Sequence, residues 1–134
     1  MKKAIMVFSF VMFLSLFSKM SFSQTLYFCT DYDDYGTPSG TSSTFYIPNG
    51  GGYFYFLVKL PYELNCTYVS YEIYTVDNNG YETFNTTIDQ TDMSKTWVWF
   101  AKKVTFYTPG YYHVYVRDCF NFILADSFVT IYYK

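Results

Sequence analysis

The stretch from Val104 to Asp118, V-T-F-Y-T-P-G-Y-Y-H-V-Y-V-R-D, constrains the fold most. Apolar side chains recur at every second position on both sides of Thr108-Pro109-Gly110, the period of strands with one buried face. Proline fixes φ and lacks an N–H, and glycine adopts positive φ without a Cβ clash, so these residues should turn the chain. The stretch predicts two strands joined by a tight corner, with an inward face formed by Val104, Phe106, Tyr112, Val114 and Val116.

The same alternation recurs along most of the chain after residue 23. All 17 tyrosines lie there, and tyrosine, phenylalanine, threonine and valine are residues that strands favour. About seven to nine short strands separated by turns predict one all-β domain over residues 24–134, an antiparallel β-sandwich. Asp31 to Thr44 is expected to be a loop, and Thr96 to Tyr107 either two short strands or one bent strand. The other expected strands are Leu26–Cys29, Thr44–Pro48, Tyr53–Leu60, Thr67–Val76, Tyr81–Ile88, Tyr111–Asp118 and Leu124–Tyr133.

Side-chain phases along these strands predict the core. The expected inward set comprises Phe54, Phe56, Val58, Leu60, Val69, Tyr71, Ile73, Phe84 and Ile88. Between two of the strands, Asn79-Gly80 suits the positive φ angles of a type I′ turn, so the chain should form a hairpin at Asp77–Gly80.

The segment from Thr108 to Asp118 resembles the corner between strands E and F, followed by strand F, of immunoglobulin-like and fibronectin-III-like modules. In those modules a tyrosine at the position of Tyr112 often hydrogen-bonds back across the corner. The resemblance covers the last third of the chain and implies an immunoglobulin-like β-sandwich. It departs from antibody-type domains, because the corresponding strands lack their cysteine pair and their tryptophan. A resemblance in fold implies no particular function.

Residues 1–23 have the organisation of a cleavable export signal. The basic pair Lys2-Lys3 precedes the apolar run Ala4–Phe17, and Ser21-Phe22-Ser23 offers small residues for cleavage before Gln24. The run spans only about 21 Å as a helix, short of a ~30 Å hydrocarbon core, which favours a signal over a membrane anchor. We expect residues 24–134 to be secreted, periplasmic or at a cell surface, without a membrane span, and the short Phe-rich signal fits a bacterial exported protein.

The charge of the mature domain argues against some classes of binding partner. Removing Lys2, Lys3 and Lys19 changes the formal net charge from −2 to −5. A mildly acidic domain with scattered lysines has no electrostatic footprint for nucleic acid and no polybasic patch for an anionic membrane.

Three cysteines leave at least one without an internal partner. If Thr67–Val76 and Tyr111–Asp118 take the places of strands C and F, they are antiparallel neighbours. Cys66, before the first strand, then lies beside Cys119, after the second. We expect these two to be the closest pair and able to form a disulfide, with Cys29 a buried thiol or an intermolecular link. The alternative is three reduced cysteines buried as small apolar residues.

The chain offers little for catalysis. Its one histidine, His113, should lie on the outward face of a strand between Tyr111 and Tyr115, and no serine or cysteine stands in a recognisable nucleophile motif. We therefore expect a surface histidine in a non-enzymatic protein, with a small secreted hydrolase as the remote alternative.

The stretch D-Y-D-D-Y-G at residues 31–36 is the best metal candidate. Asp31, Asp33 and Asp34 supply hard oxygen ligands next to the turn residue Gly36, a combination that suits calcium. Two ligand positions of a helix–loop–helix calcium loop do not match. An acidic, solvated loop is the favoured alternative, and no other cofactor is expected.

The aromatic excess is the most informative oddity. Strand phases direct eight rings away from the core, and Trp97 and Trp99 share one face of their segment. These rings either serve as exposed cross-strand pairs or form a contact surface for a protein or polysaccharide at the cell surface. A carbohydrate-binding module is the specific alternative to a protein-interaction module. The outward rings are Tyr53, Tyr55, Tyr68, Tyr74, Tyr111, Tyr115, Phe128 and Tyr132, and the candidate ligand contacts are Trp97, Trp99, Tyr53, Tyr55, Tyr74 and Tyr115.

Overall fold

The computed structural model describes residues 24–134, and the expected export signal, residues 1–23, lies outside the described residues. The described part is all-β, as the alternation predicted, and contains no helix that could cross a membrane. In chain order its strands are β1 (Thr25–Cys29), β2 (Asp31–Tyr32), β3 (Pro38–Ser39), β4 (Thr44–Ile47), β5 (Gly52–Lys59), β6 (Val69–Val76), β7 (Glu82–Gln90), β8 (Trp99–Phe106), β9 (Gly110–Arg117) and β10 (Ile123–Tyr133).

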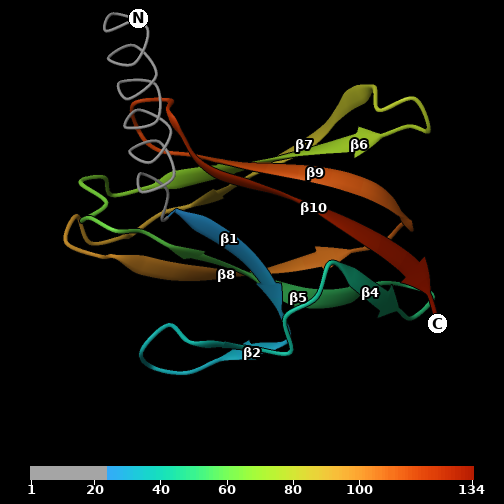
Figure 1. The fold of residues 1–134 in the computed structure, drawn as a ribbon, viewed down its shortest axis with the longest axis horizontal. Helices are drawn as coiled ribbons and strands as arrows, with labels where there is room; N and C mark the ends of the chain where they lie inside the picture. The colour runs from blue at the N-terminus through green and yellow to red at the C-terminus, as the bar shows by residue number, and fades with distance from the viewer. Residues whose placement is uncertain (1–23) are drawn as a thin grey trace, which may run out of the picture.

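The strands form two main sheets that face each other, as in a β-sandwich (Figure 1). One sheet has three antiparallel strands in the order β1-β5-β8. The other has five strands in the order β4-β10-β9-β6-β7, in which β4 pairs with β10 in parallel and the other neighbours are antiparallel. The small β2–β3 hairpin lies on the far side of the three-stranded sheet.

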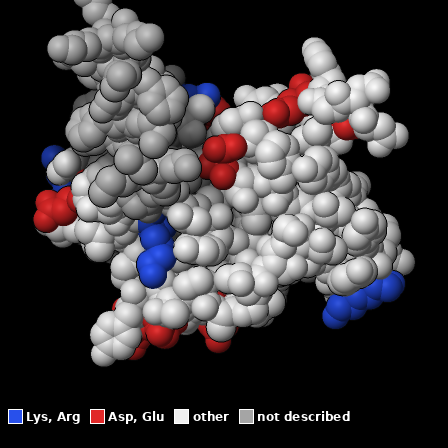
Figure 2. Space-filling model, in the orientation of Figure 1, with Lys and Arg blue, Asp and Glu red and all other residues white. Residues whose placement is uncertain are grey.

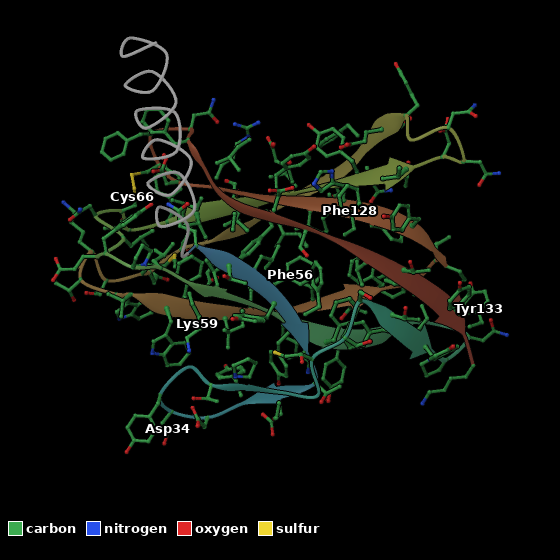
Figure 3. The ribbon with its side chains drawn as sticks, in the orientation of Figure 1. Asp34, Phe56, Lys59, Cys66, Phe128 and Tyr133 are labelled. Atoms are coloured by element: carbon green, nitrogen blue, oxygen red, sulfur yellow. A yellow bond between two sulfur atoms is a disulfide. The ribbon has the colours of Figure 1, made fainter. Side chains whose placement is uncertain are left out.

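Alternate side chains of the two sheets meet between them and form the core. Phe56 of β5 and Tyr71 of β6 are fully buried, and their ring centroids lie 5.5 Å apart across the two sheets. Figure 3 shows Phe56 between the layers. The corner strands contribute as predicted, because Val104, Phe106, Tyr112, Val114 and Val116 all belong to this core.

The corner and the cysteines follow the predicted arrangement. The Tyr112 hydroxyl donates a hydrogen bond of 2.7 Å to the Thr108 carbonyl across the corner. Cys66 and Cys119 form a disulfide with their Cα atoms 5.8 Å apart, at the ends of the neighbouring strands β6 and β9. Cys29 is a free, buried thiol, and burial together with the charge of Asp31 raises its pKa. Cys29 is thus the buried thiol that was one of the two expected outcomes for it.

The prediction that Phe84 faces the core is wrong. The pairing of β6 with β7 shifts register, so that Ile73 lies opposite Thr86 while Tyr74 lies opposite Phe84. The extra residue, Asn85, is a β-bulge that reverses the side-chain phase on its N-terminal side. Ile88 still packs against the core, whereas Phe84 points outward and is 57% exposed.

The segment predicted to be a loop contains the β2–β3 hairpin. This hairpin covers the outer face of the three-stranded sheet, where Cys29 and Leu57 are fully buried outside the main core. Gly36 permits the contact, because a Cβ there would lie 2.4 Å from the Trp99 ring. The outer face of this sheet is therefore partly a second, smaller core.

The predicted type I′ turn at Asp77–Gly80 is also wrong. Of its four residues only Gly80 has positive φ, 82°, and the Gly80 N–H donates to the Asp77 carbonyl. This is the pattern of a type I turn followed by a left-handed residue. The Asp77 carboxylate accepts backbone N–H groups from Asn79 and Tyr81.

The same aspartate-led turn recurs twice more in the described chain. Asp33 and Asp118 each accept two backbone N–H groups of their own turn through Oδ1. Gly36 and Asn121 take the left-handed position that Gly80 takes in the first turn. Each of the three hairpins thus has a turn in which an aspartate side chain accepts hydrogen bonds from backbone N–H groups of its own loop.

Candidate functional site

The candidate ligand contacts do not form one site. Trp99, Tyr53 and Tyr55 lie on the outer face of the three-stranded sheet, with Tyr32 of the β2–β3 hairpin packed between Trp99 and Tyr55. Tyr74 and Tyr115 lie on the outer face of the five-stranded sheet, on the opposite side of the molecule. Trp97 precedes β8 and is exposed.

A continuous row of rings crosses the outer face of the five-stranded sheet, from β7 through β6 and β9 to β10. We call it the aromatic band, and its members are Phe84, Tyr74, Tyr115, His113, Phe128 and Tyr111. Successive ring centroids lie between 3.8 and 5.7 Å apart. Register explains the row, because Tyr74 of β6 and Phe128 of β10 both lie opposite His113 of β9 and share one face of the sheet.

The prediction that His113 is a surface histidine is wrong. Its outward phase is correct, but Phe128 stacks on its ring at 3.8 Å and Tyr115 lies 4.1 Å away on a neighbouring position of the band. Only 6% of the residue is exposed as a result. The sequence predicted the strand face but not the rings that close over it.

Two carboxylates hold the His113 imidazole from either side. Nδ1 lies 3.0 Å from Glu82 Oε2, and Nε2 lies 2.6 Å from Asp126 Oδ2. A carboxylate can only accept, so both hydrogen bonds form at once only when both ring nitrogens carry a proton. Glu82 also accepts from the Tyr115 hydroxyl at 2.9 Å. The centre of the aromatic band is therefore a charged, hydrogen-bonded cluster.

These contacts shift the pKa values of Glu82 and Tyr115. The His113 hydrogen bond, with that of Tyr115, lowers the pKa of Glu82. Desolvation, followed by the hydrogen bond and charge of Glu82, raises the pKa of Tyr115 to about 12. Near neutral pH the arrangement is thus an ionised Glu82 that accepts from a neutral phenol and the imidazole.

The rim of the aromatic band is open to solvent. Phe84 is 57%, Phe128 40% and Tyr111 43% exposed. One further ion pair, Arg117 Nε to Glu72 Oε1 at 2.7 Å, borders the band on the side of the disulfide. Figure 3 shows Phe128 on the outside of the layer formed by β9 and β10. Large exposed rings around an ordered polar centre have the composition of a protein contact surface.

A second candidate site is a pocket where the end of β7 meets the start of β8. A pocket of about 470 Å³ is lined by Tyr32, Gln90 and the segment from Thr96 to Ala101, which includes both tryptophans. Gln90 is held in place in its lining, since its side chain accepts from the Tyr71 hydroxyl at 2.6 Å and donates to the Ala101 carbonyl at 3.0 Å. Trp97 and Trp99 thus do share a site, although the tyrosines expected with them are dispersed.

The structure does not group the side chains of the aspartates at 31, 33 and 34 as a metal-binding set. Asp33 uses one oxygen for two turn amides, and Asp31 accepts the N–H of Tyr32. Within residues 24–134 no three His, Cys, Asp or Glu side chains are grouped so as to hold a metal ion. Figure 3 places Asp34 at the outer end of the β2–β3 hairpin. The acidic solvated loop, which was the alternative to the calcium site, stays a prediction.

Charged side chains are few and scattered over the face drawn in Figure 2, where no basic patch is seen. Comparison of the chain with protein-family models, with curated proteins and with solved structures gives no match. The site must therefore be interpreted from its own geometry.

The residues that the sequence analysis missed are Glu82, Asp126 and Phe84. Glu82 is 31 residues from His113 along the chain, and only the pairing of β7, β6 and β9 brings the two together. An outward aspartate and an outward histidine on adjacent strands could have signalled the Asp126 contact. Asp126 lies opposite Tyr115, which is the next residue after His113 on the same face of β9.

Proposed function

We propose that this chain is an exported, non-enzymatic binding module with an immunoglobulin-like β-sandwich, and that it contacts a protein partner through the aromatic band. The observation that carries the proposal is the band itself. It has exposed rings at its rim, and its centre is fixed by the buried His113 and its two carboxylates. Ordered aromatic anchors lose little side-chain entropy on binding, so they favour recognition.

Strand order supports the immunoglobulin-like assignment. β5 and β8 would correspond to strands B and E, and β6, β9 and β10 to strands C, F and G, with β7 added at the edge next to C. The Tyr112 hydrogen bond matches the corner of those modules. The parallel β4–β10 pair lies outside a purely antiparallel scheme.

Export and the lack of catalysis have separate support. The basic and apolar sequence of residues 1–23 and the Cys66–Cys119 bond both fit an oxidising compartment outside the cytosol. Both nitrogens of the one histidine are held by carboxylates, which leaves neither free to act as a general base.

Affinity capture from the native source, with bound proteins identified by mass spectrometry, tests the proposal. The double variant Phe84→Ala/Phe128→Ala should reduce recovery of the partner at least about tenfold, because two truncated anchors each cost about 1 kcal/mol or more. Tyr53→Ala is the matched control, since Tyr53 is an exposed ring on the opposite sheet. Loss of the partner in Tyr53→Ala with full recovery in the double variant would refute it.

A carbohydrate-binding module is the second candidate, favoured by the pocket that contains Trp97 and Trp99. Sedimentation with insoluble polysaccharides tests it, and Trp97→Ala should abolish retention. Trp97 is the better choice for substitution, because Trp99 packs against Gly36 and supports the β2–β3 hairpin. Equal retention of Trp97→Ala and the unaltered chain would remove the pocket as the sugar site.

A further inference from the structure

Tyr46 and Tyr132 form an exposed, stacked pair at the edge of the five-stranded sheet. They are direct partners in the parallel pairing of β4 with β10, so both side chains leave the same face of the sheet side by side. Their ring centroids lie 5.5 Å apart with an interplanar angle of 27°. Tyr46 is 61% and Tyr132 50% exposed, which leaves both phenols accessible to a reagent in solution.

The other contacts between two tyrosines in residues 24–134 have a different geometry. Tyr32 and Tyr55, Tyr53 and Tyr55, and Tyr74 and Tyr115 meet at 83°, 82° and 86° respectively. An edge-to-face pair points the edge of one ring at the face of the other, so the ring carbons next to the two hydroxyls do not meet. Each of these pairs also contains a ring that is only half-exposed.

We propose that Tyr46 and Tyr132 are a site of oxidative modification, at which a peroxide-driven one-electron oxidant such as a haem peroxidase joins the two rings as dityrosine. Each phenol gives up one electron and one proton. The two radicals form a carbon–carbon bond between positions ortho to the hydroxyls, and the hydrogen on each bonded carbon then returns to the phenol oxygen. The protein loses two hydrogen atoms, and one hydrogen peroxide is reduced to two waters.

The bond would fix the shortest strand of the five-stranded sheet to its neighbour. β4 has four residues, is an edge strand, and joins the sheet only through β10. A covalent link from Tyr46 to Tyr132 would close the chain around most of the domain and restrict the unfolded state. The modified protein should therefore unfold at a higher temperature, and its β4 edge should no longer be free to open.

The test treats the full chain, at low concentration and in its folded state, with hydrogen peroxide and a haem peroxidase. We expect dityrosine fluorescence, a monomer lighter by two hydrogen atoms, and a proteolytic product that joins the peptides of Tyr46 and Tyr132. Tyr46→Phe and Tyr132→Phe should each reduce this product to background. Phenylalanine keeps the ring stack and removes the hydroxyl, so neither change should disturb the fold.

Tyr53→Phe is the matched control and should leave the yield unchanged. The unfolding temperature of the treated chain should rise, while that of treated Tyr132→Phe should not. The proposal fails if treatment gives no dityrosine, if the joined peptides contain Tyr53, Tyr55 or another tyrosine in place of this pair, or if the product is mainly a covalent dimer of two chains.

Discussion

At the scale of single residues, the ionisation of the Glu82 carboxyl group makes the stability of the fold depend on pH. His113 and Tyr115 lower its pKa below the ordinary value of 4.5, so the folded state favours the carboxylate. Its contribution to stability is therefore present above the pKa of the unfolded chain and is lost as pH falls through the lower pKa of the folded chain.

We expect Glu82→Gln to be less stable than the unaltered chain near neutral pH, with a difference that shrinks as the solution is acidified below about pH 4.5. Urea unfolding of both proteins, from about pH 7 down to about pH 3, measures this difference. A difference that stays constant to the lowest pH would show that the ionisation of Glu82 does not stabilise the fold.

Tyr71 makes the second residue-scale prediction. Its hydroxyl is buried and donates to Gln90, whose amide links the edge of β7 to β8 in the other sheet. Burial also raises the pKa of this hydroxyl well above its usual range. Tyr71→Phe leaves the half-buried amide oxygen of Gln90 without this donor and should reduce the free energy of unfolding by about 0.5–1.5 kcal/mol. An unchanged urea midpoint in this variant would mean that the link between the sheets contributes nothing.

At the scale of elements, the three aspartate-led turns determine what the acidic hairpin can do. Asp33 is engaged by the amides of Tyr35 and Thr37, and these hydrogen bonds lower its pKa. We expect calcium, and equally a chelator, to leave the thermal unfolding midpoint of the chain unchanged, while Asp33→Ala loosens the β2–β3 hairpin. Calcium-dependent stabilisation that disappears in Asp33→Ala would restore the metal site.

The sequence predicted some strands and hairpins but not others. Alternation identified the long strands and their inward faces, because burial of one face imposes a period of two. It failed at Phe84, since the single extra residue Asn85 reverses the phase and leaves no mark in the pattern. It also missed the β2–β3 hairpin, which is held by turn chemistry and by contacts with Trp99 rather than by any periodicity.

At the scale of the whole molecule, the Cys66–Cys119 bond joins the neighbouring strands β6 and β9 across a sequence separation of 53. A loop of that length corresponds to about 4 kcal/mol in the chain-entropy model. The double variant Cys66→Ala/Cys119→Ala should lose stability of that order in urea unfolding, and Cys29→Ala should not alter the disulfide. Equal midpoints for the double variant and the oxidised chain would show that the bond does not stabilise the fold.

The candidate site was only partly predictable, because it depends on the strand order of the whole molecule. Strand phase placed Tyr74, Tyr115 and Phe128 outward, and the structure has them outward. Whether two outward rings lie on the same sheet depends on strand order. The strand order places some of the expected ligand contacts on the three-stranded sheet and others on the five-stranded sheet. The contact of His113 with Glu82 depends on strand order, because Glu82 lies 31 residues away on β7, and no local pattern contains that information.

The most direct test of the account is oxidative footprinting of aromatic side chains, read by mass spectrometry, on the chain alone and bound to its captured partner. In the free chain Phe84, Phe128 and Tyr111 should react readily while the buried Phe54 and Phe56 resist. Binding should protect the first three and leave Tyr53 as reactive as before. Unchanged reactivity of Phe84 and Phe128 in the complex, together with protection of Tyr53 or Trp97, would contradict the assignment of the aromatic band as the contact surface.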